Sequence, residues 1–455
     1  MKYCNKIILG IIFGILLLVN AAYASDDVKI IINNQELHTV DKPIIVEGRT
    51  MLPVRAIGEA LGCEVFWFGP KKTANIKNDS TIISMQIKNK NITKQKVTSG
   101  QNMLLQTDVA PILVNDRMYA PVRALAESLD AIAGWDSVTR SVIIVYDTTL
   151  KYAGNYSVST YAGTGERKKH DSNLLTMSFI SPESIDISEN GDVYISDSGL
   201  IRKLSGGKSS TMEIEPAYIT ASVARCNNDE VYILTNEFQN DDGIKYYGIA
   251  KLGNSGAQGL FVTEAAYSKI PDFDVSRDGK IYAIYDNVGA GQNYLAEIDK
   301  DTGDVKYIKE IDSGIKALTV DDNGNIFLAN TVKGSIYFYD TAASDLRLFA
   351  GRDNCLKFVD GPNPMFFEPR KLDFKDGYLY VLDYNIVRRV SVNSANSATF
   401  SETIAGKVSA EQNPVTENGK ASEVVFAPSY LMDIAVGNEG ILLTDPKNSQ
   451  IRMIK

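Results

Sequence analysis

Two stretches of the chain follow one plan: RTMLPVRAIGEALGCEVFW at residues 49–67 and RMYAPVRALAESLDAIAGW at residues 117–135. One constant offset aligns them without a gap, so that Arg49 matches Arg117 and Pro53 matches Pro121. The chain has two tryptophans, Trp67 and Trp135, and each closes one copy. The sequence therefore contains one structural unit written twice.

Each copy combines strand and helix signals. An apolar strand and a polar turn precede Pro53, and proline suits the first turn of a helix because its missing N–H would be unpaired there. Val54, Ile57 and Leu61 then recur at helical spacing on one face. A strand ending at the tryptophan and a β-rich stretch follow. The pattern predicts a pair of β-α-β-β units.

The first residues are typical of a signal peptide. Lys2 and Lys6 precede the apolar run Ile7–Val19, and Ala22–Ala24 supplies small residues at the cleavage positions. An uncleaved anchor is the alternative, but the run is shorter than the roughly 20 residues that a membrane span needs. No cysteine follows the run directly, which argues against a lipid anchor. We expect residues 1–24 to be removed and the protein to be exported.

Composition narrows the classes of function. Cys63, Cys226 and Cys355 are far apart, unlike the close pairs of a disulfide framework or metal cluster, so we expect three buried apolar thiols. The net charge of −9 makes nucleic acid an unsuitable partner.

Beyond residue 150 the period changes to short strands. IDISENGDVYISDSGLIRKL at residues 185–204 is echoed at 372–390 and 434–454, with looser copies between. Repeats of this size built of short strands predict a propeller. Six unevenly spaced copies align on Tyr194, Tyr232, Tyr282, Phe327, Tyr380 and Leu442.

The chain ends suggest how the ring closes. The propeller begins with the strand Tyr156–Ala162, which resembles the outer strands ending in Ala-Gly at Ala350-Gly351 and Ala405-Gly406. It ends with Gln450–Ile454, the third strand of the last blade. Pairing these two segments would remove two exposed sheet edges.

We therefore predict a mainly β protein: a small α+β domain of two repeated units followed by a six-bladed β-propeller. The expected boundaries are a signal peptide at 1–24, the duplicated domain at 25–147, a linker at 148–155 and the propeller at 156–455.

The duplicated segment resembles the copper amine oxidase N-terminal-like domain, a stalk that carries none of the copper chemistry of those enzymes. Amine oxidase activity is excluded because a copper site needs several histidines and the chain has His38 and His170. Asp383-Tyr384-Asn385 also reverses the motif that forms the quinone cofactor. The pairs Arg55–Glu59 and Arg123–Glu127 fit structural helix pairs, with binding of an anionic polymer as the alternative.

The propeller segment resembles NHL repeats, best in blades 1, 5 and 6. The resemblance rests on Ala162-Gly163-Thr164-Gly165, Pro182, Gly191, Tyr194, Asp197, Ile201 and Arg202. It implies two kinds of enzyme to consider: zinc lyases, which need more histidines than His170, and lactonases with a channel calcium.

Four oxygen-bearing side chains could converge on such a calcium ion, namely Asp197, Asn330, Asp383 and Asp445. We favour a structural role in which each bonds the backbone of the turn that follows. The segment Asp321–Asn325 likewise fits a β-turn better than a calcium loop.

We expect a non-catalytic exported cell-envelope protein, secreted or cell-wall associated in a Gram-positive-type bacterium. Its partner would be a protein or a cell-wall glycan, bound through propeller loops such as Phe238–Tyr246 and Val288–Tyr294. We assign no catalytic, metal or cofactor-binding residue and no cofactor. The alternative is a calcium-dependent lactonase or hydrolase with its site in the channel. The seven lysines of residues 71–96 fit a solvated face, or contact with anionic wall polymer.

Overall fold

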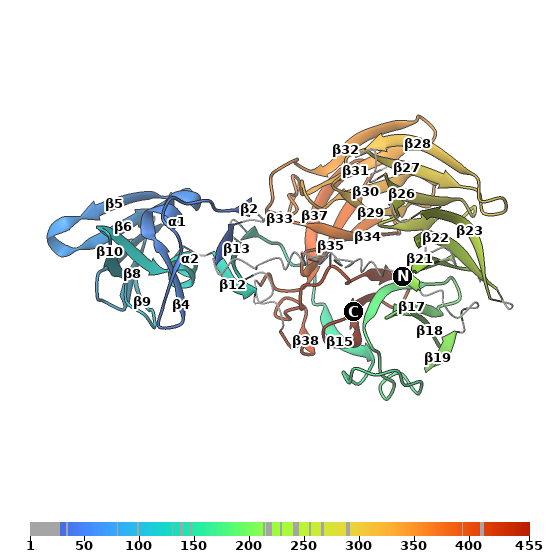
Figure 1. Cartoon of the computed structure of the whole chain (residues 1–455), viewed down its shortest axis with the longest axis horizontal. Coiled ribbons are helices and arrows are strands. Elements are labelled where there is room, and N and C mark those ends of the chain that lie inside the picture. Colours follow the sequence, from blue (N-terminus) through green and yellow to red (C-terminus); the bar gives the residue numbers. More distant parts are fainter. Residues whose placement is uncertain are drawn as a thin grey trace, which may run out of the picture.

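The structure is a computed structural model with an α+β module beside a β-propeller (Figure 1). It describes residues 28–32, 35–79, 81–97, 100–129, 131–136, 140–145, 148–212, 214, 221–227, 230–239, 245–253, 256–264, 268–287, 292–393, 395–409 and 414–455. The expected signal peptide lies outside these residues. Within them, no helix has the length and apolar character needed to cross a bilayer.

The duplication is confirmed, but the predicted β-α-β-β plan was incomplete, because each unit has a further strand just before its helix, where a turn was predicted. The equivalent pairs, related by the same offset as the two tryptophans, are β3 (Ile44–Val46) and β10 (Ile112–Val114), β4 (Arg49–Pro53) and β11 (Arg117–Pro121), α1 (Val54–Ala60) and α2 (Val122–Ser128), β5 (Glu64–Phe68) and β12 (Ile132–Asp136), β6 (Thr73–Lys77) and β13 (Ser141–Val145). Strands β4 and β11 pair antiparallel, and Leu52 lies opposite Ala120, its own equivalent. The two copies are therefore related by a local two-fold axis through this pair.

Three sheets enclose the core of this module. The central one has the order β10-β11-β4-β3. A second is β5-β6-β7-β8-β9, with β7 at Thr81–Gln86, β8 at Asn91–Lys96 and β9 at Asn102–Gln106. The third is β12-β13-β1-β2, with β1 at Lys29–Ile32 and β2 at Gln35–Glu36. The predicted helix face is buried, since Val54, Ile57 and Leu61 are each at most 7% exposed.

The six repeats form six separate sheets, which confirms the propeller and its blade count. Blade 1 is β16 (Pro182–Ile187), β17 (Val193–Asp197), β18 (Leu200–Ser205) and β19 (Lys208–Met212); blade 2 is β20 (Ala221–Asn227), β21 (Glu230–Gln239), β22 (Lys245–Gly253) and β23 (Gly256–Glu264); blade 3 is β24 (Ser268–Lys269), β25 (Phe273–Val275), β26 (Ile281–Asn287), β27 (Gln292–Ile298) and β28 (Val305–Ile311). Blade 4 is β29 (Ile315–Val320), β30 (Ile326–Asn330), β31 (Ser335–Asp340) and β32 (Asp345–Gly351); blade 5 is β34 (Pro369–Lys375), β35 (Tyr378–Asp383), β36 (Ile386–Val392) and β37 (Ala398–Ala405).

Blade 6 closes the ring in the predicted way. It contains β39 (Ile434–Val436), β40 (Ile441–Asp445), β41 (Gln450–Ile454), β15 (Ser157–Ala162) and β38 (Gly419–Lys420). Strand β15 pairs antiparallel with β41, with Val158 opposite Ile454. The first strand of the propeller thus completes the last blade and covers its edge.

The Ala-Gly endings have a steric cause. Gly163, Gly351 and Gly406 have φ of 96°, 82° and 97°, a region that favours glycine. A Cβ at these positions would lie 2.8, 2.6 and 2.7 Å from the backbone oxygen just before the third strand of the same blade. Glycine therefore lets each outer strand end against that strand.

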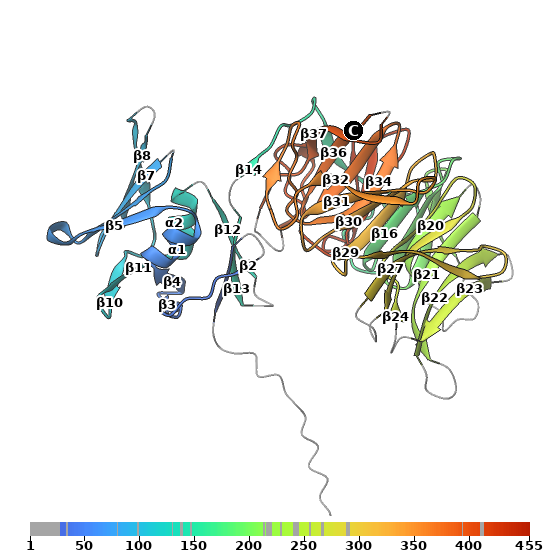
Figure 2. The ribbon, with the colours of Figure 1, turned by 90° about the horizontal axis from the view of Figure 1, so that it is seen from above.

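The segment expected to be a linker is bonded to the propeller. Strand β14 (Thr148–Thr149) pairs with β33 (Phe358–Val359), and the Ala153 N–H donates to Thr403 O at 2.8 Å. Val145, at the end of the N-terminal module, packs with propeller residues including Phe358 and Phe367. Figure 2 shows β14 running from that module onto the propeller. The junction is a packed contact.

Candidate ligand-binding cleft

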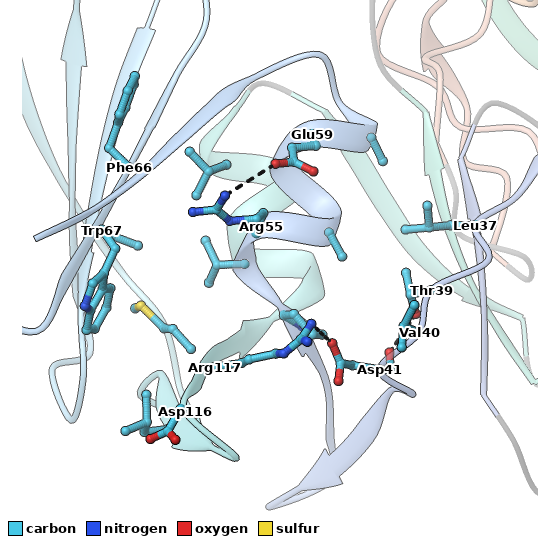
Figure 3. Close-up of a pocket in the computed structure, with 18 of the residues that line it drawn as sticks. Leu37, Thr39, Val40, Asp41, Arg55, Glu59, Phe66, Trp67, Asp116 and Arg117 are labelled. Carbon is cyan, nitrogen blue, oxygen red and sulfur yellow. Dashed lines mark hydrogen bonds and ion pairs between the residues drawn. The ribbon is translucent and has the colours of Figure 1, made fainter. Parts of the chain in front are cut away.

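A cleft of about 700 Å³ opens on the N-terminal module. Helix α1, strand β5, the segment between β2 and β3, and the β10–β11 turn surround it (Figure 3). Lining side chains that bear on ligand chemistry are Val40, Arg55, Glu59, Phe66, Trp67 and Arg117. Elements from both copies of the duplicated unit therefore build this one cleft.

An aromatic wall forms one side of the cleft. Phe66 is 54% exposed and Trp67 45% exposed, although residues of this size are usually covered. Both lie on β5, the edge strand of its sheet, and as consecutive residues they point to opposite faces: Trp67 lies opposite Ala74, which also lines the cleft, and Phe66 lies opposite Asn75 at the rim. In the second copy, Gly134 occupies the position of Phe66. The two copies thus differ at this wall.

Charged pairs lie across from the aromatic wall. Arg55 and Glu59 on α1 are 3.9 Å apart and both more than half exposed, so the pair contributes little to stability. The predicted helix pair is thereby confirmed in the first copy. Arg117 forms an ion pair with Asp41 on the opposite rim. Both pairs keep donors and acceptors available to a ligand.

The cleft combines apolar and polar surfaces in the proportion typical of small-ligand sites. The rings of Phe66 and Trp67 offer flat faces that can stack on the C–H face of a sugar or on another ring. Arg55, Glu59 and Asp41 offer charge-assisted hydrogen bonds. His38 also lines the cleft.

The four polar residues weighed as calcium ligands have structural partners. Asn330 accepts from the N–H groups of Val332 and Lys333, and Asp445 from that of Asn448, as predicted for the turn that follows. Each belongs to a different blade. Their oxygens are therefore engaged by their own blades.

Asp197 and Asp383 differ from the prediction in one respect. Asp197 accepts from the N–H groups of Ile180 and Ser181 at 2.8 and 2.7 Å, ahead of the first strand of its blade, and pairs with buried Arg202. Asp383 makes the same contacts with residues 367 and 368 and pairs with Arg388. The prediction that these two side chains bond the turn that follows was therefore wrong. A buried carboxylate needs hydrogen-bond donors, and here the nearest ones are the guanidinium and the N–H groups ahead of the first strand.

The propeller channel contains its own charged side chains. Arg225 of blade 2 bonds Asp272, next to blade 3, and Asp433, next to blade 6, both at 3.1 Å. Lys371 of blade 5 also lies 3.1 Å from Asp272. Blades 2 and 6 are not neighbours in the ring, so these side chains meet across its axis. We name Arg225, Asp272, Lys371 and Asp433 the channel plug.

Three further aspartates each join two neighbouring blades by a hydrogen bond. Asp186, Asp274 and Asp373 occupy equivalent positions in blades 1, 3 and 5. Each accepts from a backbone N–H of the next blade, at 2.7, 2.9 and 2.6 Å. Burial, with repulsion from Asp186 and against the attraction of Arg225, raises the pKa of Asp274 to about 6. The repeated strings IDI, FDV and LDF are the sequence signal that could have identified them.

Neither the cleft nor the channel plug includes Asp321, His170 or the three cysteines. Across the described residues, no group of three His, Cys, Asp or Glu side chains is arranged to hold a metal ion. Asp321 accepts from the N–H groups of Asn323 and Asn325, the β-turn that was predicted. His170 is exposed. Cys63 is buried as expected, whereas Cys226 and Cys355 are partly exposed.

Residues 31–144 match the family model of the copper amine oxidase N-terminal domain. The match covers about a quarter of the chain, which is the part that contains the cleft. No curated protein matches the chain.

Solved structures share the fold over a longer span. A Bacteroides thetaiotaomicron protein of unknown function is 16% identical with a TM-score of 0.52, over 86% of this chain and 98% of its own. Auxiliary nutrient binding proteins from B. thetaiotaomicron and Bacteroides ovatus are each 14% identical over 86% of this chain and 97% of theirs, with TM-scores of 0.52 and 0.51. These identities show the fold alone. The comparisons do not support a Gram-positive-type origin.

Proposed function

We propose that this chain is a non-catalytic binding protein of the cell envelope that takes a glycan in the cleft of its N-terminal module. The exposed pair Phe66 and Trp67 beside the ion pairs of Arg55 and Arg117 carries the proposal. Exposing large rings to water opposes folding by the hydrophobic effect, and a ligand stacked on Trp67 would cover that ring. The alternative to be tested is that the cleft binds a protein.

The proposal keeps the expected organisation of the chain. Residues 1–24 would direct export, residues 25–147 would form the binding module, 148–155 would join it to the propeller, and 156–455 would form that propeller. The propeller loops expected to bind ligand, Phe238–Tyr246 and Val288–Tyr294, lie partly outside the described residues. The cleft therefore replaces them as the site proposed.

The channel plug favours a non-catalytic binding protein over a calcium-dependent hydrolase. A channel calcium needs several free oxygen ligands, whereas Arg225 and Lys371 place two cations among the carboxylates there. Metal analysis of the purified protein, with thermal unfolding in calcium and in chelator, tests this point. A stoichiometric ion whose removal lowers the melting temperature would support the hydrolase instead.

Tryptophan fluorescence tests the cleft directly. A Trp135→Phe variant leaves Trp67 as its one tryptophan, so its emission reports the aromatic wall. Oligosaccharides released from cell walls should shift this emission saturably, and Phe66→Ala should weaken the binding about tenfold. The matched Trp67→Phe variant leaves Trp135 and should show no such shift. Calorimetric binding of the same oligosaccharides that persists unchanged in a Trp67→Ala, Phe66→Ala double variant would contradict the proposal, and capture of a protein by the cleft would replace the glycan.

A further inference from the structure

The sheet β5-β6-β7-β8-β9 has a strongly positive end that the cleft does not use. Residues 71–96 contain seven lysines and one acidic residue, Asp79. Six of these lysines are exposed, and Lys94 is buried. Figures 1 and 2 both place this sheet at the end of the module away from the propeller. Its outer face is therefore not covered by the propeller.

Two separate turns bring four of the lysines together. Lys71 and Lys72 follow β5, whereas Lys88 and Lys90 lie between β7 and β8. The Ile87 N–H donates to Lys72 O at 3.0 Å, and Gln86 Nε2 donates to Lys71 O at 2.9 Å. The two turns are thus bonded side by side. We name Lys71, Lys72, Lys88 and Lys90 the lysine end.

One acidic residue beside this end of the sheet is paired with another side chain. The Thr107 N–H donates to Lys90 O at 2.9 Å, which places the start of the next loop beside the lysine end. The acid in that loop, Asp108, forms an ion pair with Arg49. Lys72 and Lys88 have φ of 50° and 63°, a conformation in which glycine or asparagine is favoured. Lysine thus occupies two positions where local geometry prefers other residues.

Uncharged hydrogen-bonding side chains continue from the lysine end over the outer face of the sheet. Thr73 lies opposite Gln86, and Asn91 opposite Gln106. In the next row the Ser84 hydroxyl donates to Asn75 Oδ1 at 2.6 Å, and Phe66 lies opposite Asn75. Amide and hydroxyl groups can both donate and accept, as sugar hydroxyls do.

We propose that the lysine end and this polar face bind an anionic polysaccharide. Four exposed ammonium groups supply charges that complement carboxylate or phosphate groups spaced along a polymer. The amide and hydroxyl rows supply partners for the sugar units between those groups. None of the four lysines lines the cleft, so the inference holds whether or not the cleft binds a glycan.

Binding to alginate, a polymer of uronic acids, tests the inference with the intact chain. The protein should bind immobilised alginate and not neutral dextran, and the affinity should fall as salt is raised because salt screens exposed charges. Replacing Lys71, Lys72, Lys88 and Lys90 by glutamine should lower the affinity at least tenfold. The matched control replaces four exposed propeller lysines, Lys208, Lys269, Lys306 and Lys309, and should retain the affinity.

Three outcomes would overturn the inference. They are equal loss in the two quadruple variants, equal binding of dextran, and binding to vesicles containing phosphatidylglycerol without binding to alginate. If the quadruple variant does not fold, the Lys71→Gln, Lys72→Gln pair and the Lys88→Gln, Lys90→Gln pair are measured separately. Each pair should then weaken alginate binding at least threefold, and an unchanged affinity in both would also overturn it.

Discussion

Replacing Arg225 by methionine should destabilise the propeller substantially. Arg225 donates to Asp272 and Asp433, each 3.1 Å away, and both carboxylates are fully buried. Removing one partner of a buried ion pair costs about 3–5 kcal/mol because a buried charge is left uncompensated. Lys371 remains 3.1 Å from Asp272, so we expect the lower end, about 3 kcal/mol. In a domain of this size that corresponds to a fall in melting temperature of roughly 6 °C.

Differential scanning calorimetry at one fixed scan rate measures the effect. The control is Arg277→Met, because the Arg277–Asp322 pair is exposed on both sides and its loss should cost less than about 1 kcal/mol. The Arg225→Met, Asp433→Asn double variant should recover at least half of the lost stability, since the uncompensated carboxylate is gone. A single variant that melts within about 1 °C of the parent, or a double variant no more stable than the single one, would refute the reasoning.

The pH dependence of the Arg225→Met variant has a defined sign. Burial acts to raise the pKa of Asp433, yet attraction from Arg225 and Lys371 holds it below its ordinary value. Without Arg225, the folded-state pKa of Asp433 should rise above its unfolded value. The folded state then binds more protons than the unfolded one, so stability falls as pH rises. The deficit relative to the parent should therefore be larger at pH 7 than at pH 4.

Three further perturbations test other parts of the structure. Because the pKa of Asp274 is about 6 in the folded state, its contribution to stability should fall by about 2 kcal/mol between pH 4 and pH 6, and Asp274→Asn should flatten that part of a melting-temperature profile; a parallel profile would exclude it. Gly406→Ala should lower the free energy of unfolding, measured with denaturant, by about 2–4 kcal/mol, because its Cβ would lie 2.7 Å from a backbone oxygen. The control Gly377→Ala, with φ of 77° and open space around it, should lower it by about 1 kcal/mol. Val158→Asp in the closing strand β15 should lower the melting temperature by roughly 6 °C, because Val158 is buried. Substituting its exposed neighbour in the same way, Ser159→Asp, should leave the melting temperature unchanged. Equal effects would argue that burial of β15 against β41 does not stabilise the ring.

Regular repetition made much of the fold predictable. The constant offset between the two copies placed the first strand, the helix and the two later strands of each unit, because strand and helix periods are properties of neighbouring residues. Strands β4 and β11 were missed, since that stretch was predicted as a turn leading into the helix. The Ala-Gly endings likewise predicted which segments close the ring, since each marks an outer strand. Of the four polar residues after the second strands, Asn330 and Asp445 bond the turn that follows as predicted, whereas Asp197 and Asp383 bond residues ahead of the first strand. Local chemistry was sufficient for the predictions that were confirmed.

The sites depend on residues that the sequence keeps apart. The channel plug joins four residues from different blades across one axis, and nothing near Arg225 in the sequence indicates Asp433 as its partner. The cleft forms where Asp41 faces helix α1 and strand β5, and the lysine end exists because two turns are hydrogen-bonded together. The sequence alone thus determined the repeated units, their number and the ring closure, because each rests on short-range periodicity. Only the tertiary structure decided which side chains meet, because the packing of distant segments sets those distances.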